Sequence, residues 1–293
     1  ITMKNLHIIL ILALVLFSCG EQKKKSHSIV KKPKKHHGIK LHDKGDSDNA
    51  MESFDKKNIG RSELLDNGIS VKWFQETFEK NPTLKDGEVC LISYRVSLPN
   101  GKIIDGNNRI NLPFIPFMVG YNMQFKGWDI GIKQLKVGDF AKIEIPSELA
   151  YANQGLAGIV PANSPIWVYI KLIAKVSPEY NQNGVKVWTF DQGSDGEFDN
   201  TQDKEVIYQM ISSSKNKASI QNSFTKKFPF RYTIGQKNVL PGLKRVLKNA
   251  KKGQKIFVLL SPEQAYGKKG YADMVSPNEH IFCNITVTDI KGN

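Results

Sequence analysis

The sequence predicts an α+β fold that occurs twice in one chain. At 293 residues the chain is long enough for about two domains. Apolar, β-branched runs bounded by turn residues dominate each half, and each half holds one short amphipathic stripe with helical spacing. Long antiparallel strands with a single helix of this kind describe an α+β domain, in which the helix covers one face of the sheet.

A set of glycines and one tyrosine recurs at a constant spacing. The pairs that lie 115 positions apart are Gly120 and Gly235, Gly127 and Gly242, Gly138 and Gly253, Tyr151 and Tyr266, and Gly155 and Gly270. We also match Tyr94 with Tyr208, at a spacing of 114. Tight turns and close backbone approaches require glycine. The register therefore predicts one domain repeated, at residues 67–176 and 183–293, with a short connection at 177–182.

Local pattern places the elements of the first copy. Val89 to Val96 is an apolar run bounded by Asp86-Gly87 and Pro99-Asn100-Gly101, so we expect a strand that ends in a turn. Residues 140–145 and 166–176 are predicted as further strands. The helical stripe consists of Phe125, Trp128, Ile132 and Leu135. The second copy repeats this stripe in Val239, Leu243, Val246, Leu247 and Ala250.

The N-terminus has the order of a secretory signal peptide. Lys4 precedes ten apolar residues, Ile8 to Phe17, which are too few to span a bilayer, where about 20 are needed. Ser18 and Cys19 follow. This arrangement resembles the bacterial lipobox, so we expect a signal peptide at residues 1–18 and lipidation of Cys19. A plain signal peptide with an incidental cysteine is the alternative.

Residues 19–66 show no periodicity and are rich in lysine, so we expect a disordered tether behind the lipid anchor. The net charge of +14 permits nucleic-acid binding. An exported lipoprotein rarely meets nucleic acid, however, so contact with an anionic membrane surface or a simple solvated spacer is favoured. Four of the six histidines lie here without the spacing of a defined metal site. Of the three cysteines, Cys90 and Cys283 lie in apolar runs and are expected in the core.

Neither copy contains a nucleophile elbow, a metal-ligand spacing or a phosphate-binding loop, so no metal or cofactor is expected. The first copy instead carries a collinear series of aromatic and branched side chains with one carboxylate and one tyrosine. These motifs are Gly101-Lys102-Ile103-Ile104-Asp105, Pro113-Phe114, Phe117-Met118-Val119-Gly120, Gly127-Trp128-Asp129, Val137-Gly138-Asp139, Ala150-Tyr151 and Gly158-Ile159-Val160-Pro161. In this order they resemble the FKBP-type peptidyl-prolyl cis-trans isomerases. The resemblance covers residues 67–176 and, more weakly, 184–290.

The resemblance implies a bent antiparallel sheet wrapped around a short helix, with a substrate proline held between them. It assigns the floor of the pocket to Trp128, hydrogen-bond donors to the Tyr151 hydroxyl and the Phe125 N–H, and a rim position to Asp105. The apolar side chains that it assigns to substrate binding are Tyr94, Ile104, Phe114, Phe117, Phe125, Ile159, Val160 and Val168.

Two departures from the family pattern stand out in the first copy. Ile104 and Val168 replace the usual aromatic residues, which enlarges the pocket and could alter the preference for the residue before proline. An extra residue near Phe114 means that Phe114 and Phe117 could exchange places.

The second copy departs at the positions that matter for catalysis. Gln221 stands at the carboxylate position, Leu243 at the tryptophan position, and Cys283 at the position of Val168. A polar stretch, residues 212–223, replaces the short turn. We expect the fold to persist with little or no catalysis, which leaves a surface that binds unfolded chain or stabilises the first copy.

Three functions follow as hypotheses. The first is a lipid-anchored prolyl isomerase of the bacterial cell envelope that acts on proline-containing exported polypeptides. The second is a non-enzymatic chaperone or assembly module, and the third is a structural lipoprotein of an envelope machine. Asp105, Trp128 and Tyr151 together favour the enzyme. Glu21, rather than an aspartate near Cys19, favours the outer membrane, whereas the client proteins and the oligomeric state stay open.

Overall fold

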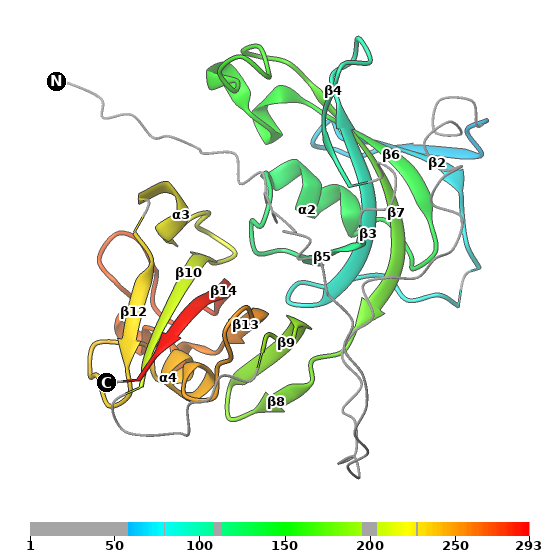
Figure 1. Cartoon of the computed structure of the whole chain (residues 1–293). Coiled ribbons are helices and arrows are strands. Elements are labelled where there is room, and N and C mark those ends of the chain that lie inside the picture. The colour runs from blue at the N-terminus through cyan, green and yellow to red at the C-terminus, as the bar shows by residue number, and fades with distance from the viewer. Residues whose placement is uncertain (1–57, 79, 108–112, 195–203, 227, 293) are drawn as a thin grey trace, which may run out of the picture.

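The computed structural model describes residues 58–78, 80–107, 113–194, 204–226 and 228–292 (Figure 1). These residues form two seven-stranded antiparallel sheets, each accompanied by one main helix. The expected signal peptide, Cys19 and most of the expected tether lie outside the described residues. Among the residues that are described, no helix is long and apolar enough to cross a membrane.

The first sheet has the strand order β1-β2-β6-β7-β3-β4, with β5 paired to β3. Figure 1 shows α2 on the inside of the curve that β3 and β7 form. The elements of this domain are β1 (Arg61–Leu64), β2 (Ser70–Gln75), β3 (Val89–Ser97), β4 (Ile103–Gly106), β5 (Ile115–Met118), α2 (Lys126–Ile132), β6 (Phe140–Ile145), the 3₁₀ turns η1 (Ser147–Leu149) and η2 (Ala152–Gln154), and β7 (Ile166–Val176).

The second sheet has the order β11-β10-β14-β13-β9-β8, with β12 paired to β10. Read from β8 to β11, this order is that of the first sheet with each strand replaced by its counterpart. The duplication seen in the sequence is therefore a duplication of the fold. The elements are β8 (Tyr180–Gln182), β9 (Val185–Asp191), β10 (Glu205–Ser213), β11 (Gln221–Asn222), α3 (Ser223–Lys226), β12 (Phe230–Thr233), α4 (Pro241–Leu247), β13 (Lys255–Leu260), η3 (Pro262–Gln264), η4 (Gly267–Lys269) and β14 (Ile281–Lys291).

The predicted strands and helix occur where the sequence pattern places them. The run beginning at Val89 is β3, and the other two predicted strands coincide with β6 and β7. The helical stripe forms α2, with Phe125 as the N-cap and Trp128 and Ile132 buried. Leu135 lies just beyond the last helical residue, where it is fully buried in the core.

Helix α2 packs unusually close to β6, and glycine makes this possible. A Cβ atom on Gly127 would lie 2.2 Å from a methyl carbon of Ile145, and one on Gly131 would lie 2.5 Å from Ile143. The repeated glycine of the second domain, Gly242, faces Leu260 at 2.4 Å in the same way. The recurrence of this glycine therefore reflects the approach of helix and sheet, which no larger side chain permits.

Two short strands extend the domains beyond the boundaries expected from the sequence. Strand β1 lies inside the expected tether of residues 19–66, and β8 lies inside the expected connection of residues 177–182. All four residues of β1 are exposed, so the segment shows no apolar alternation. Backbone pairing with β2 at the sheet edge holds it, and side-chain pattern cannot report such pairing.

The strand register corrects the match of Tyr94 with Tyr208. Tyr94 pairs with Ile170 on β7. The counterpart of Ile170 on β14 is Ile285, and Ile285 pairs with Met210. Tyr208 lies directly after the β-bulge in β10, as Ile92 does in β3. The second domain therefore has methionine at the position of Tyr94. The sequence match was wrong because a register defined by strand pairing depends on bulges that the sequence spacing does not reveal.

The same register supports the match of Gln221 with Asp105. Asp105 pairs with Val96, and Gln221 pairs with Ser212, the counterpart of Val96 on β10. The carboxylate of the first domain thus has an uncharged amide as its counterpart in the second.

Each domain has its own core between helix and sheet, and a third apolar cluster joins the two domains. Cys90 and Cys283 are fully buried free thiols, one in each core. The third cluster combines residues of both domains, which are Val89, Met118, Tyr121, Trp188, Phe190, Phe257, Leu259 and Phe282.

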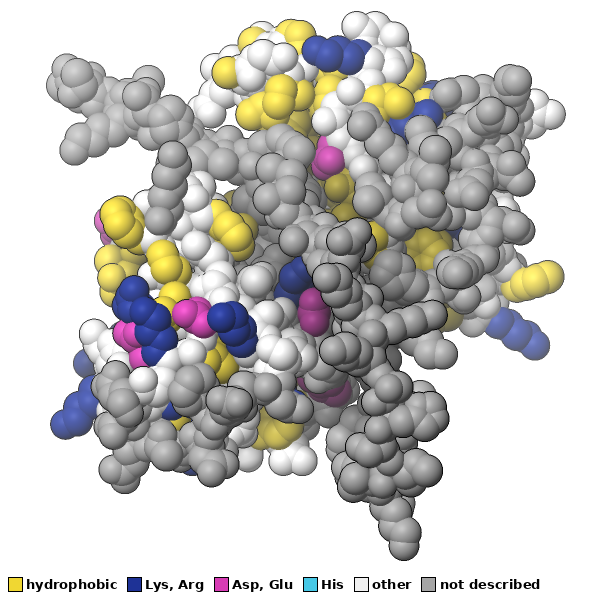
Figure 2. Space-filling view, in the orientation of Figure 1, with side chains coloured by type: hydrophobic (Ala, Val, Ile, Leu, Met, Phe, Trp, Pro, Cys, Tyr) yellow, Lys and Arg dark blue, Asp and Glu magenta, His cyan; other side chains and the backbone are white. Residues whose placement is uncertain are grey.

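Charged side chains of both signs lie side by side on the visible face of the second domain (Figure 2). Arg231 pairs with Glu205 and Lys252 with Asp289, each at 2.8 Å. Among the described residues on this face, cations are interspersed with anions.

A buried carboxylate fixes the segment that follows β2. Asp139 is 1% exposed, and it accepts hydrogen bonds from the Trp73 indole at 3.0 Å and from the backbone N–H groups of Thr77 at 2.8 Å and Lys136 at 2.9 Å. These donors satisfy the charge inside the protein, and removing the acceptor would leave them unpaired.

We predict that Asp139→Ala lowers the free energy of unfolding by about 3 kcal/mol, because several buried donors lose one charged acceptor. Urea denaturation measures the effect. Asp289→Ala is the matched control, since Asp289 lies at the surface and its side chain pairs with Lys252, and it should leave the midpoint unchanged. Equal midpoints for Asp139→Ala and wild type would contradict the assignment.

Candidate active site

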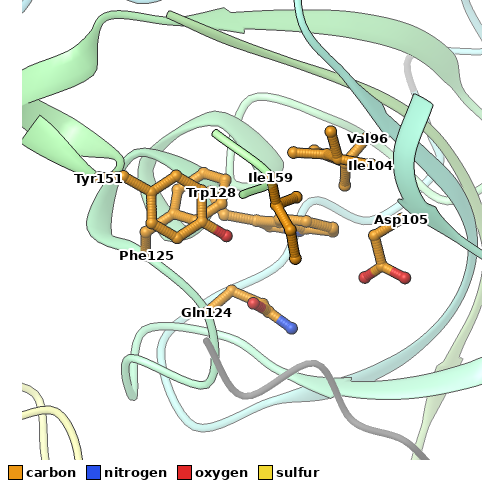
Figure 3. A pocket seen from close by; sticks show the side chains of 8 residues that line it. All are labelled: Val96, Ile104, Asp105, Gln124, Phe125, Trp128, Tyr151 and Ile159. Atoms are coloured by element: carbon orange, nitrogen blue, oxygen red, sulfur yellow. The ribbon is translucent and has the colours of Figure 1, made fainter. Parts of the chain in front are cut away.

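A small pocket, open to solvent, lies between α2 and the sheet of the first domain (Figure 3). Strands β3 and β4 form one side of it, and α2 with its preceding loop forms the base. The segment after β6 forms the opposite side. The lining residues are Val96, Ile104, Asp105, Gln124, Phe125, Trp128, Tyr151 and Ile159.

Trp128 forms the base of this pocket. Its side chain is 2% exposed. The ring of Tyr94 contacts it edge-on with centroids 5.2 Å apart, and Phe117 stacks on it at 5.7 Å. The indole N–H finds no hydrogen-bond partner among the described residues. Aromatic packing on several sides holds the indole in one orientation, which gives the pocket a rigid apolar floor.

The carboxylate of Asp105 is fixed at the rim by two hydrogen bonds. The Tyr94 hydroxyl donates to Oδ2 at 2.9 Å, and the Gly106 backbone N–H donates to Oδ1 at 2.8 Å. Burial and the negative charge of Asp105 raise the pKa of the Tyr94 hydroxyl above its ordinary value. The phenol therefore keeps its proton and acts as the donor that orients the carboxylate.

Tyr151 stands across the pocket from Asp105 (Figure 3). Its ring packs against Phe125 with centroids 5.4 Å apart at an angle of 63°. Burial, and secondarily the negative charge of Asp105, raise the pKa of the Tyr151 hydroxyl. This hydroxyl donates to no acceptor within the described part of the chain, so it is a protonated donor that is free to bind a ligand.

The backbone N–H of Phe125 is a second donor. Phe125 is the N-cap of α2, and the first N–H groups of a helix have no acceptor within the helix. Across the residues that the structure describes, the Phe125 N–H meets no acceptor. The pocket thus presents an apolar floor with two hydrogen-bond donors beside it.

The structure distributes the site residues expected from the sequence over two layers. The residues that line the pocket are Ile104, Asp105, Phe125, Trp128, Tyr151 and Ile159. Tyr94 and Phe117 lie behind this lining, in contact with Trp128. Val168 is fully buried opposite Val96 on β3, and Val160 is 3% exposed in the core.

Phe114 is placed away from the lining, which decides between Phe114 and Phe117. Strand β5 begins at Ile115, and successive side chains of a strand point to opposite faces. Phe117 shares a face with Ile115 and stacks on Trp128. Phe114 precedes the strand and is not among the residues that line the pocket.

Sequence reasoning missed two lining residues, Val96 and Gln124. Val96 pairs with Asp105 across β3 and β4, a relation that appears only once the strand register is known. Gln124 directly precedes Phe125, whose N–H had been assigned, and this adjacency was the available signal. In Figure 3 its carboxamide lies between Phe125 and Asp105 at the open edge of the pocket.

The second domain has lost the floor of this arrangement. Leu243 occupies the position of Trp128, and Met210 that of Tyr94. The counterpart of Tyr151 is Tyr266, whose ring stacks on Tyr271 at 5.1 Å. Throughout the described residues of both domains, no three His, Cys, Asp or Glu side chains gather in a way that could hold a metal ion.

Comparison with known proteins shows the family to which this fold belongs. A family model described as FKBP-type peptidyl-prolyl cis-trans isomerase matches residues 80–173 and 196–288. FK506-binding protein 4 of Saccharomyces cerevisiae is 37% identical over 114 residues, which cover 39% of this chain and 28% of the relative. A peptidyl-prolyl cis-trans isomerase of the same yeast is 36% identical over 118 residues, which cover 40% of this chain and 28% of the relative.

FK506-binding protein 4 of Gibberella zeae is 40% identical over 106 residues, 36% of this chain and 20% of the relative. The crystal structure of the three FKBP domains of wheat FKBP73 aligns with a TM-score of 0.37 and 18% identity, covering 78% of this chain and 97% of that structure. The chain thus spans less than a third of the length of these three curated relatives. The family model matches both copies of the repeat, and the chain belongs to the FKBP-type peptidyl-prolyl cis-trans isomerase family.

Proposed function

We propose that the chain is a peptidyl-prolyl cis-trans isomerase that acts through the pocket of its first domain. The observation that carries this proposal is the apolar floor of Trp128 with the unpartnered Tyr151 hydroxyl beside it. A small apolar pocket with few, well-placed donors suits the ring of a proline and the carbonyl groups on either side of it.

The reaction needs little covalent chemistry from the protein. Rotation about an X–Pro bond must break amide resonance, with a barrier of ~18–20 kcal/mol. The planar amide has a larger separation of charge than the twisted one. A site that removes water from the bond therefore favours the twisted form, and stronger binding of the transition state than of the substrate accelerates the rotation. In this pocket Trp128, Ile104 and Ile159 exclude the water.

Two donors orient the substrate. The Tyr151 hydroxyl and the Phe125 N–H each bind one substrate carbonyl, so that the peptide is held while the bond between them turns. Asp105 does not transfer a proton in this scheme. The hydrogen bonds from Tyr94 and Gly106 fix its carboxylate at the rim, where its charge acts on the carbonyl region.

We further propose that the clients are exported, proline-containing polypeptides and that Cys19 anchors the chain by lipid in the bacterial cell envelope. The N-terminal cation, the short apolar run and the following cysteine support this proposal. Several acyl chains on one residue, at about 0.8 kcal/mol per buried CH₂, would hold the protein at a membrane. Neither a nucleic acid nor a cofactor takes part in this function.

The test of the isomerase is a refolding assay in which proline isomerisation limits the rate. Wild type should accelerate the slow phase. Tyr151→Phe should lower kcat/KM about tenfold, the factor for one lost hydrogen bond, and Trp128→Leu, which installs the residue of the second domain, should lower it further. Tyr266→Phe is the matched control in the second domain and should leave the rate unchanged. A wild-type rate equal to the uncatalysed one would sink the proposal.

The pH dependence of the reaction follows from Tyr151. Because burial raises its pKa, the hydroxyl keeps its proton at pH values where an exposed tyrosine, with a pKa near 10, ionises. We therefore expect kcat/KM on a short peptide to stay constant up to about pH 10. Tyr151→Phe should give the same flat profile at a lower level. A decline near pH 10 in wild type that is absent from Tyr151→Phe would show that the hydroxyl has an ordinary pKa.

Lipidation can be tested separately from catalysis. In a bacterial host fed labelled palmitate, wild type should carry the label and sediment with membranes. Cys19→Ser should carry no label and remain in the soluble fraction. Ser18→Ala keeps a small residue before the cysteine and should behave as wild type. Label on Cys19→Ser, or unlabelled wild type, would refute the anchor.

A further inference from the structure

The two domains are docked through a buried apolar contact. Tyr121 of the first domain packs edge-on against Phe282 of the second, with ring centroids 6.5 Å apart, and Phe282 in turn contacts Phe257 at 5.0 Å. Where the chain passes from one domain to the other, the Trp188 indole N–H donates to the Val176 carbonyl at 3.0 Å. These residues are 9% exposed or less, apart from Val176, which is only partly buried.

A polar contact lies beside this cluster and involves the polar stretch that distinguishes the second domain. The Ser213 hydroxyl donates to the Tyr121 carbonyl. The Asn122 carboxamide donates to the carbonyl oxygens of Ser214 at 2.8 Å and Lys215 at 3.0 Å. Lys215 also pairs with Asp86 at 3.0 Å. The end of β10 and the residues after it thus hold one segment of the first domain.

That segment leads directly into the pocket. Residues 120–125, here named the pocket loop, end in Gln124 and Phe125, both of which line the pocket. Within the loop, Asn122 has a φ of 51°, a left-handed conformation that is uncommon for residues with a side chain. Its contacts with the second domain are made two and three residues before Gln124.

The opposite side of the pocket loop is held by the helix that carries Trp128. The buried carboxylate of Asp129 accepts the N–H of Gly120 at 2.7 Å and the N–H of Asn122 at 2.9 Å. The loop is therefore fixed from two sides, by α2 of its own domain and by Ser213 to Lys215 of the other. Asp129 alone leaves the Asn122 side chain and the Tyr121 carbonyl without a partner, and the second domain provides both.

We propose that the second domain is a positioning element for the active site of the first. Ser213, Ser214 and Lys215 hold the pocket loop so that the Phe125 N–H and the Gln124 side chain face the bound proline. The turn that follows β10, which has Ser214 and Lys215 where the turn after β3 has Leu98 and Pro99, then serves this contact. The inference rests on the proposed isomerase function, which it extends to a domain that lacks a catalytic floor of its own.

The experiment compares variants on the two sides of the contact in the full chain. Ser213→Ala removes the hydroxyl that binds Tyr121, and Asn122→Gly removes the carboxamide while keeping a residue that accepts a positive φ. Trp188→Phe is the matched control, because it removes a side-chain hydrogen bond between the domains that does not involve the pocket loop and keeps the apolar packing. The measurements are kcat/KM on an X–Pro tetrapeptide, amide hydrogen exchange at Gly120, and the urea midpoint.

Ser213→Ala and Asn122→Gly should each lower kcat/KM about fivefold, as expected for the loss of one ordinary hydrogen bond that acts on the transition state. Ser213→Ala should also speed exchange of the Gly120 amide. Trp188→Phe should lower the urea midpoint but leave kcat/KM and this exchange rate at the wild-type values.

Three results would overturn the inference. If wild type is active and both Ser213→Ala and Asn122→Gly leave kcat/KM unchanged, the inference is refuted while the isomerase function stands. An equal loss of kcat/KM in Trp188→Phe would show that docking as such, and not the pocket loop, supports activity. If wild type does not isomerise the tetrapeptide, the proposed function fails independently of this inference. In that case the positioning contact is refuted if Ser213→Ala leaves the exchange rate of the Gly120 amide unchanged.

Discussion

The close approach of helix α2 to strand β6 is the constraint on which the rest of the first domain depends. Gly127 and Gly131 have no side chain at the points where the helix meets Ile145 and Ile143. The helix can therefore lie directly on the sheet. Trp128, which follows Gly127, faces the pocket between helix and sheet. A larger residue at either glycine would lift the helix and move the floor of the pocket together with the Phe125 N–H at its N-cap.

The second domain separates the requirements of the fold from those of the site. It keeps the glycine that permits the approach, Gly242, and the same strand order. It replaces Trp128 by Leu243, which is also buried, at 3% exposed. Leucine fills the core but gives no flat aromatic surface, so the fold is retained while the floor is lost. The second domain thus keeps the backbone geometry of the first without the aromatic floor of its pocket.

The second domain is in direct contact with the first domain. Aromatic residues of the second domain pack against Tyr121, and backbone carbonyls of the same domain bind Asn122. The first domain contributes the tryptophan floor, and the second contributes partners for a loop that ends at the pocket. The residues that differ between the two copies therefore include some that join them, since Ser214 and Lys215 after β10 stand where Leu98 and Pro99 follow β3.

The sequence alone determined the features that depend on local pattern. Alternating and continuous apolar runs located β3, β6 and β7, because strand periodicity is written in neighbouring residues. The recurring glycines located the repeat, and three residues singled out from the sequence, Trp128, Tyr151 and Asp105, line one pocket. The exposed edge strand β1 was missed, since backbone pairing leaves no trace in its side chains.

Only the tertiary structure decided the features that depend on register and on contacts between distant segments. It placed Met210 rather than Tyr208 opposite Ile285, chose Phe117 over Phe114, and brought Val96 and Gln124 into the pocket. It also docked the two domains at Tyr121. Each of these depends on which backbone groups pair across the chain, and a shift of one residue there reverses the face of a side chain without altering the local sequence.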